Sequence, residues 1–112
     1  MFPKALVGAA VRPLMLSILS RGESYGYEII QHLHAYSDGK LAWGDGTLYP
    51  VLHRLEGEGL IASTWRLSEK GRKRKYYRIT PAGEHALAQE KAYWLDMHAI
   101  LLKLWGPELA LG

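Results

Sequence analysis

The stretch GDGTLYPVLHRLEGEGL, residues 44–60, carries the pattern that decides the fold. Within it, Leu48, Val51, Leu52 and Leu55 fall at positions i, i+3, i+4 and i+7. This spacing predicts an α-helix that packs one apolar face on the core. The other side chains of the helix then point outward or sideways, where they are available for a function.

Pro50 lies inside this apolar pattern, although proline removes a backbone donor and disturbs a helix interior. If Thr47 is the N-cap, Pro50 occupies the first turn, where its missing amide has no partner to lose. If the helix starts at Gly44 or Asp45, Pro50 kinks it one turn in. Both alternatives place the helix start near the proline, and the glycines of residues 57–59 predict its end.

Two helices are predicted before this stretch. The first runs from about Lys4 to Leu19 and ends before Gly22, and Glu23-Ser24 offers a cap for the second. The second covers residues 25–36, where the spacing predicts that Tyr27, Ile30 and Leu33 share a buried side. The turn sequence of residues 37–40 follows, and residues 41–43 are compatible with a very short strand.

A β-hairpin and a long helix are predicted after it. Residues 60–67 and 75–80 are rich in β-branched and aromatic side chains and are joined by the basic segment 68–74. Thr80 then caps a helix whose first residue is Pro81. Gly106-Pro107 should stop that helix.

The order of elements predicts a fold that is mainly α with a small β-hairpin. Two helices joined by a short turn and followed by a hairpin form the winged version of the helix-turn-helix. Here these are the second and third predicted helices and the hairpin. We therefore expect a winged helix-turn-helix domain over residues 1–80, a C-terminal dimerisation helix over 81–105 and a tail over 106–112. In such domains the third helix enters the major groove of DNA and the hairpin lies along the backbone or minor groove.

The positive charge of the chain is concentrated in one segment. Residues 66–78 contain seven basic residues and one acidic residue, whereas the remainder of the chain carries an excess of acidic residues. The whole chain has a formal net charge of +3. A charge gathered in thirteen residues indicates a polyanionic partner.

Composition excludes several classes of protein. The chain has 112 residues and no cysteine, so a single domain is expected and disulfides and cysteine-based zinc sites are excluded. Lys4 and Arg12 interrupt the apolar N-terminal segment, which argues against a transmembrane helix and a signal peptide. We expect a cytoplasmic protein without a membrane partner.

An enzyme is not expected. No serine lies in a Gly-x-Ser-x-Gly turn, and there is no cysteine nucleophile. His32 and His34 are two residues apart and point to different faces of a helix. The sequence predicts no catalytic residue, no metal site and no cofactor, because its histidines form no His-x-x-x-His pair: His32, His34, His53, His85 and His98.

Three motifs resemble the PadR family of bacterial transcriptional regulators. They are YGYEI (residues 25–29), GTLYPVLHRLEGEGLI (46–61) and GRKRKYYRITPAGEHAL (71–87), and they follow the order and spacing of the family. With Trp94 the resemblance spans residues 14–102. A single long helix after the wing is similar to the short-chain branch, whose members dimerise through that helix. The resemblance implies a dimeric DNA-binding protein, with repression as the common mode.

Candidate DNA contacts come from the start of the third helix and from the hairpin tip. Hydroxyl groups and the positive end of a helix dipole favour phosphate, and basic tip residues add salt-dependent affinity. For Tyr49 half-buried packing is the alternative, and for Arg54 an ion pair with Glu58. A basic tip can equally be a solvated strand edge, and strand alternation makes some of its residues spectators. The predicted DNA-binding residues are Tyr27, Thr47, Tyr49, His53, Arg54, Lys70, Arg72, Lys73, Arg74 and Lys75.

The last predicted helix has more apolar surface than one small domain can cover. A two-fold related copy would cover it and would match a palindromic operator. The predicted dimer interface contains Leu87, Trp94, Met97, Leu101, Leu104 and Trp105.

By resemblance, a tryptophan at the position of Trp94 lines a cavity between protomers where aromatic or cationic ligands stack. His98 shares its face, and Arg12 and Met15 of the other protomer would lie nearby. Indole faces suit such ligands. The alternative is that Trp94 is dimer core, and Arg12 argues against a cationic ligand unless it turns outward.

Two functions follow from these patterns. The first is a dimeric repressor that binds double-stranded DNA and is released by a small effector or another signal. The alternative is a winged helix that binds another protein and no DNA. Strongly salt-dependent binding to nucleic acid separates the two.

Overall fold

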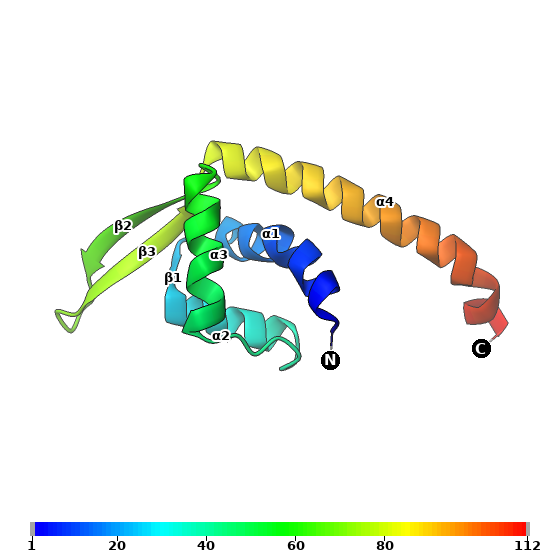
Figure 1. Cartoon of the computed structure of the whole chain (residues 1–112), viewed down its shortest axis with the longest axis horizontal. Helices are drawn as coiled ribbons and strands as arrows, with labels where there is room; N and C mark the ends of the chain where they lie inside the picture. The colour runs from blue at the N-terminus through cyan, green and yellow to red at the C-terminus, as the bar shows by residue number, and fades with distance from the viewer. Residues whose placement is uncertain (1, 112) are drawn as a thin grey trace.

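The computed structural model describes the backbone of residues 2–111 and the side chains of residues 2–106. A three-helix body carries a small sheet on one side, and a long last helix runs across the top of the body and beyond it (Figure 1). The fold is mainly helical with a small antiparallel sheet, which confirms the predicted winged helix-turn-helix class. The elements are α1 (Lys4–Ser20), β1 (Ser24–Tyr25), α2 (Gly26–Tyr36), α3 (Asp45–Gly57), β2 (Ile61–Leu67), β3 (Lys73–Ile79) and α4 (Pro81–Leu111).

The apolar face of α3 is buried as its spacing predicts. Leu48 and Leu52 are fully buried, and Val51 and Leu55 are nearly so. They belong to one core cluster with side chains of α1, α2, the sheet and the start of α4. The cluster contains Met15, Leu16, Ile18, Leu19, Ile29, Leu33, Leu48, Val51, Leu52, Leu55, Ile61, Tyr77 and Leu87.

The start of α3 settles the question that Pro50 raises. Gly44 is the N-cap and Asp45 is the first helical residue, so the Thr47 alternative is wrong. Pro50 therefore lies inside the helix, more than one turn from its start. The helix ends as predicted: Gly59 has φ 77°, and the amide of Leu60 donates to the carbonyl of Leu55 at 3.0 Å.

The sheet has three strands in the order β1-β3-β2, one more than the predicted hairpin. Ser24 pairs with Tyr77 and Tyr25 with Tyr76, both antiparallel. The prediction that Glu23-Ser24 caps α2 is therefore wrong, because this segment joins the sheet and Tyr25 is the N-cap residue. The short strand expected over residues 41–43 is also wrong, since this segment is irregular.

Two further details of the helices differ from the expectation. Tyr27 is 64% exposed, and the buried residues of α2 are Gly26, Ile29 and Leu33. The long helix α4 begins at Pro81 as predicted, with the amide of Gly83 donating to the hydroxyl of Thr80 at 3.1 Å. It continues past Gly106-Pro107 to Leu111, because one proline removes only one helical hydrogen bond and residues 108–111 favour helix.

No helix within residues 2–111 has the length and apolarity that crossing a membrane requires.

Candidate nucleic-acid interface

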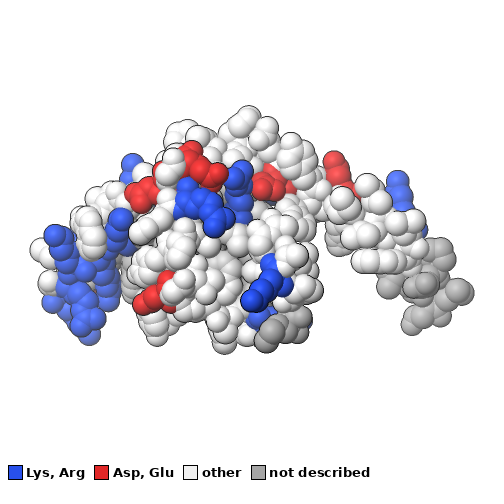
Figure 2. Space-filling view, in the orientation of Figure 1, with Lys and Arg blue, Asp and Glu red and all other residues white. Residues whose placement is uncertain are grey.

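The hairpin β2–β3, here called the wing, has a basic tip. Ser68 closes the tip: its amide donates to the carbonyl of Arg72 at 2.7 Å and its hydroxyl accepts from the amide of Arg72 at 3.1 Å. Figure 2 shows that lysine and arginine gather at this tip, whereas basic and acidic residues alternate over the body. The predicted concentration of charge therefore becomes a compact positive surface at the end of the wing. Lys70, Arg72 and Lys73 are exposed there.

One face of the wing is turned toward α3. In the antiparallel register Trp65 lies opposite Lys75, and alternation puts Lys73 and Tyr77 on the same face. Glu56 of α3 fixes this face, because its carboxylate accepts from the Ser63 hydroxyl and lies 3.8 Å from the Lys75 ammonium group.

A cavity with a volume of about 510 Å³ lies between this face of the wing, the start of α2 and the helix α3. We call it the wing cavity. It brings together residues that are far apart in the sequence, and it combines tyrosine hydroxyls with ammonium and guanidinium groups. Hydrogen-bond donors beside cations are the groups that bind phosphate. Its lining includes Tyr25, Gly26, Tyr27, Tyr49, His53, Trp65, Arg72, Lys73, Arg74, Lys75 and Tyr77.

Tyr49 lies against the first residue of α2. A Cβ atom on Gly26 would stand 2.5 Å from the Tyr49 hydroxyl oxygen and 3.1 Å from its Cζ atom. The glycine therefore leaves the space that the ring occupies. Tyr49 is 37% exposed, so its packing on α2 leaves part of the side chain accessible.

The floor of the cavity contains a buried hydroxyl. Tyr77 is 1% exposed, and its hydroxyl has no hydrogen-bond partner among the side chains that the structure describes. Burial raises the pKa of Tyr77 above its ordinary value of 10.0, and Tyr49 and Glu56 raise it further. The group is therefore a neutral phenol at physiological pH.

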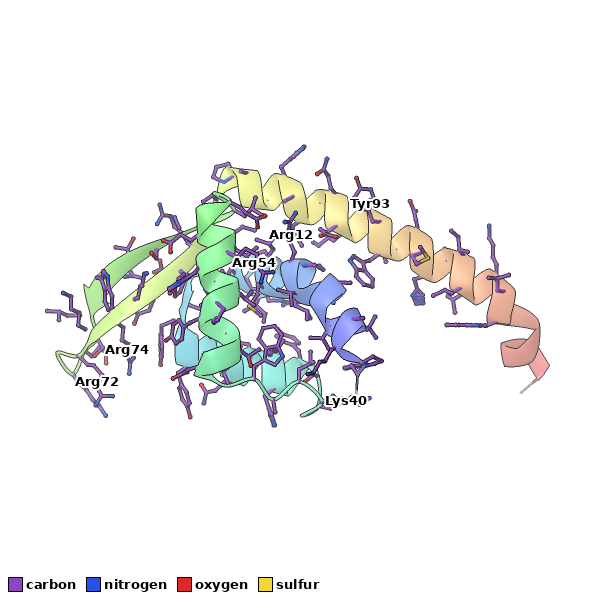
Figure 3. The ribbon with its side chains drawn as sticks, in the orientation of Figure 1. Arg12, Lys40, Arg54, Arg72, Arg74 and Tyr93 are labelled. Carbon is purple, nitrogen blue, oxygen red and sulfur yellow. The ribbon has the colours of Figure 1, made fainter. Side chains whose placement is uncertain are left out.

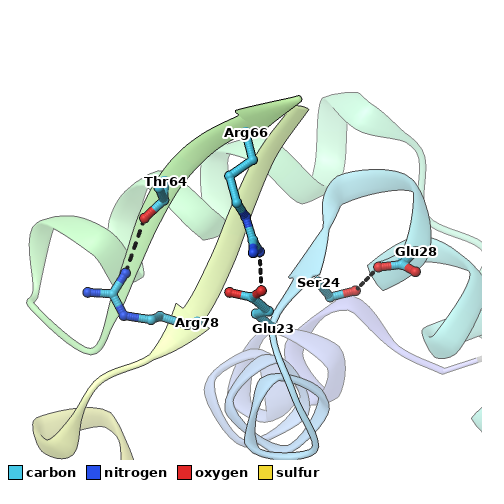
Figure 4. Close-up of polar contacts among 6 residues, drawn as sticks. All are labelled: Glu23, Ser24, Glu28, Thr64, Arg66 and Arg78. Carbon is cyan, nitrogen blue, oxygen red and sulfur yellow. Dashed lines mark hydrogen bonds and ion pairs between the residues drawn. The ribbon is translucent and has the colours of Figure 1, made fainter. Parts of the chain in front are cut away.

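The opposite face of the wing holds arginines that are already engaged. Arg66 pairs with Glu23 and lies 4.2 Å from the centroid of the Tyr76 ring, and Arg78 donates to the Thr64 hydroxyl at 3.4 Å (Figure 4). Arg74 lies 4.2 Å from the centroid of the Tyr25 ring.

Figure 3 shows Arg74 along the wing and Arg72 at its tip. Arg72 is exposed, whereas Arg74 is stacked on a tyrosine and only partly exposed. The structure thus divides the predicted basic residues into free ones and ones that support the sheet.

Arg54 is not brought to the wing cavity. It lines a separate pocket with Arg12, Glu58 and Glu90, between α3, α1 and α4 (Figure 3). The carboxylate of Glu58 accepts from Arg12 at 2.9 Å, so the predicted pair of Arg54 with Glu58 is replaced by a link from α1 to α3. Thr47 and His53 are exposed on α3, and His53 alone of the two lines the wing cavity.

Trp65 also belongs to this surface, although no pattern in the sequence predicts it. It is 58% exposed, and the ammonium groups of Lys73 and Lys75 lie 5.4 and 6.0 Å from its ring centroid. Strand alternation predicts which residues of β2 share a face with Trp65, but not which residues of β3 lie beside it. Its neighbours on β3 depend on the register, which five loop residues at the tip determine.

Within one protomer the predicted effector residues lie apart. Trp94 lines an apolar cavity of about 300 Å³ with residues of α1 and α2 of its own chain, among them Pro13, Arg21 and Tyr36. Met15 is fully buried in the core and does not reach the surface, which removes it from this set. Arg12 and His98 do not line this cavity, since Arg12 is on the α3 side of α1 and His98 is exposed further along α4.

The exposed large apolar side chains of α4 lie between Tyr93 and Trp105. Met97, Leu104 and Trp105 are 53%, 71% and 51% exposed, and Leu101 is partly exposed. Leu87 differs: it is 4% exposed and packs in the core of its own chain, so its predicted place in a dimer interface is wrong. Tyr93, which points away from the body in Figure 3, adds to the exposed apolar face.

Within the described residues no cluster of histidine, aspartate and glutamate side chains could hold a metal ion.

The chain matches known proteins over most of its length. Residues 15–89 match the transcriptional regulator PadR-like family. The chain is 42% identical to the transcriptional regulator Rv3488 of Mycobacterium tuberculosis over 85 residues, which are 74% of either chain.

Solved structures match as well. A PadR-like transcriptional regulator of Bacillus cereus is 32% identical with a TM-score of 0.80, over 90% of this chain and 96% of that one. A transcriptional regulator of Clostridium thermocellum is 33% identical with a TM-score of 0.79, over 89% of this chain and 97% of that one. The matched span contains α2, α3, the wing and the start of α4.

Proposed function

Because the chain belongs to the PadR-like family of transcriptional regulators, we propose that it is a repressor that binds a palindromic operator as a homodimer. The resemblance seen in the sequence motifs is thereby confirmed, and proteins of this family are regulators and not enzymes. The observation that carries the proposal is the wing cavity, which joins the start of α3 to a basic wing. Its partner in this proposal is double-stranded DNA in the cytoplasm.

In the proposed complex the first turns of α3 enter the major groove and the wing follows the backbone. The hydroxyls of Thr47 and Tyr49 bind phosphate, and His53 lies within reach of base edges. Arg74 positions Tyr25 and the sheet, and Arg54 has a secondary place, because it lies apart from the wing cavity. The wing and α2 contribute Tyr27, Lys70, Arg72, Lys73 and Lys75.

The homodimer is proposed from the exposed face of α4. Met97, Leu101, Leu104 and Trp105 would leave water when a second copy packs on this face, which is a large hydrophobic gain. Two domains related by a two-fold axis would then meet two half-sites of a palindrome.

An effector is proposed for the cavity beside Trp94. Its lining is apolar and aromatic, and Arg21 lies 5.2 Å from the centroid of the Tyr36 ring at its edge. A flat aromatic molecule fits this chemistry better than a cation, because Arg21 would repel a cation. Binding of this effector between α1, α2 and α4 would change the orientation of the DNA-binding elements relative to the dimerisation helix.

Replacing Gly26 with alanine tests the role of Tyr49. The new Cβ would force the Tyr49 ring out of its place, although alanine in a helix is otherwise favoured over glycine. We expect a folded protein whose affinity for its operator falls roughly tenfold, as for the loss of one hydrogen bond to a charged group. Fluorescence anisotropy with labelled operator measures this.

Gly57→Ala is the matched control, because nothing lies within 4 Å of its Cβ position. In a Tyr49→Phe background, Gly26→Ala should lower the affinity little further, since the phosphate-binding hydroxyl is already absent and only the 3.1 Å approach to Cζ remains. Wild-type affinity of Gly26→Ala would assign Tyr49 to packing alone.

The proposed function is tested with the DNA immediately upstream of the gene for this protein. Anisotropy against scrambled DNA of equal length, over a range of salt, should show tight binding to the native fragment only. Equal and steeply salt-dependent binding to both would indicate a wing that binds without an operator. Absence of binding at low salt would overturn the proposal and leave the protein-binding winged helix in its place.

A further inference from the structure

Trp65 is a large apolar side chain in an unusual position, the water-exposed surface of a basic wing. It is 58% exposed, and it stands in the middle of the wing face that is turned toward α3. Its indole contributes to no cluster of the core. A side chain that leaves this much apolar surface in water gains free energy when a partner covers it.

The neighbours of Trp65 indicate the chemistry of that partner. The ammonium groups of Lys73 and Lys75 lie 5.4 and 6.0 Å from the ring centroid, within cation–π range. An apolar plate is thus placed directly beside two positive charges. The DNA backbone offers the complementary pattern, because each deoxyribose presents C–H groups next to an anionic phosphate.

The place of Trp65 in the wing cavity favours DNA over a protein partner. The cavity continues from Trp65 to Tyr49 and His53 of α3 without an acidic residue in its lining. Its lining contains four cationic side chains, namely Arg72, Lys73, Arg74 and Lys75. The carboxylate of Glu56, which contacts this face, is already bound to Ser63 and Lys75. A polyanion is therefore the partner that this surface fits.

We propose that Trp65 contacts DNA directly, by packing its indole on the deoxyribose of a nucleotide whose phosphates are bound by Lys73 and Lys75. This inference rests on the proposed DNA binding and adds a contact that carries no charge. The wing would then bind through two separable contributions: the lysines supply the salt-dependent one, and Trp65 supplies one that does not change with salt.

Salt titrations of operator binding separate the two contributions. We expect Trp65→Ala to lower the affinity by about tenfold at every salt concentration, as for about 55 Å² of apolar surface returned to water, with an unchanged slope of log K against log salt. Trp65→Phe should recover part of the loss. Lys73→Ala should instead reduce the slope by about 0.9.

Thr64→Ala is the matched control, because Thr64 lies on the opposite face of the same strand and should not affect affinity. Two outcomes would overturn the inference. One is unchanged affinity of Trp65→Ala, and the other is a loss that appears wholly as a reduced slope, which would make Trp65 only a support for the lysines.

Fluorine NMR of the full chain labelled with 5-fluorotryptophan provides a measurement without loss of the side chain. The resonance of Trp65, identified by its disappearance in Trp65→Phe, should shift when operator DNA is added. An unshifted resonance at saturating DNA would overturn the inference alone. Failure of the wild-type protein to bind any duplex would overturn the proposed function together with it.

Discussion

Replacing Leu104 with aspartate should convert the protein to a monomer and weaken operator binding by about 10²–10⁴-fold. Leu104 is 71% exposed in the single chain, so the change should leave the fold of each protomer intact. In a dimer the new carboxylate would be trapped in an apolar interface, at a cost of several kcal/mol. The loss in DNA binding follows because two linked domains occupy two half-sites far more tightly than one domain occupies one.

Sedimentation velocity at micromolar concentration measures the first effect, and fluorescence anisotropy with operator DNA the second. Gln89→Asp is the control: it adds the same charge to the same helix at an exposed polar position. A wild-type protein that sediments as a monomer would refute the proposed dimer. A Leu104→Asp variant that remains dimeric would show that the interface lies elsewhere.

Neutralising Arg72 and Lys73 together should weaken binding to every duplex by roughly 30-fold near 0.15 M salt. Both residues are exposed at the tip, and neither is paired with an acidic side chain in the described part of the chain. Removing one phosphate-binding cation lowers the slope of log K against log salt by about 0.9, so the slope should fall by about 1.8. Discrimination between operator and scrambled DNA should be retained, because phosphate contacts carry no sequence information.

Arg78→Ala serves as the control for this pair. Arg78 is a basic residue of the same hairpin, but it lies on the opposite face, where it donates to Thr64. It should lower the slope much less than either tip residue. An unchanged slope in the Arg72→Ala, Lys73→Ala protein would show that the tip does not contact the DNA backbone.

Local patterns predicted the four helices of this fold, although not the cap and buried face of α2 or the end of α4. The spacing of Leu48, Val51, Leu52 and Leu55 fixes which face of α3 is buried, and Thr80-Pro81 fixes where α4 begins. Strand β1, which the sequence did not predict, has only two residues, and its pairing partners on β3 are more than fifty residues away in the sequence. No local pattern signals such a pairing, because its hydrogen bonds depend on how the rest of the chain folds.

The candidate interface shows the same division between local and distant information. Alternation indicates that the wing residues divide between two faces, but it does not say which face meets α3. The register places Lys73 and Lys75 on the same face as Trp65, and the ion pair of Lys75 with Glu56 turns that face toward α3, whereas Arg74 lies on Tyr25. Charge alone could therefore predict the basic residues of the wing, Arg74 included, but not Trp65, which carries no charge.

The length of α4 has a mechanical consequence for the proposed dimer. Its first half rests on the body, whereas its second half extends beyond it (Figure 1). If the copies pair through that second half, each α4 is a lever arm whose pivot is remote from α3. The first half of this 31-residue helix is about 23 Å long at a rise of about 1.5 Å per residue, so a turn of about 10° at the pivot moves the start of α4 by roughly 4 Å, on the order of one base-pair step. Residues that never touch DNA would then tune the half-site spacing that the regulator accepts.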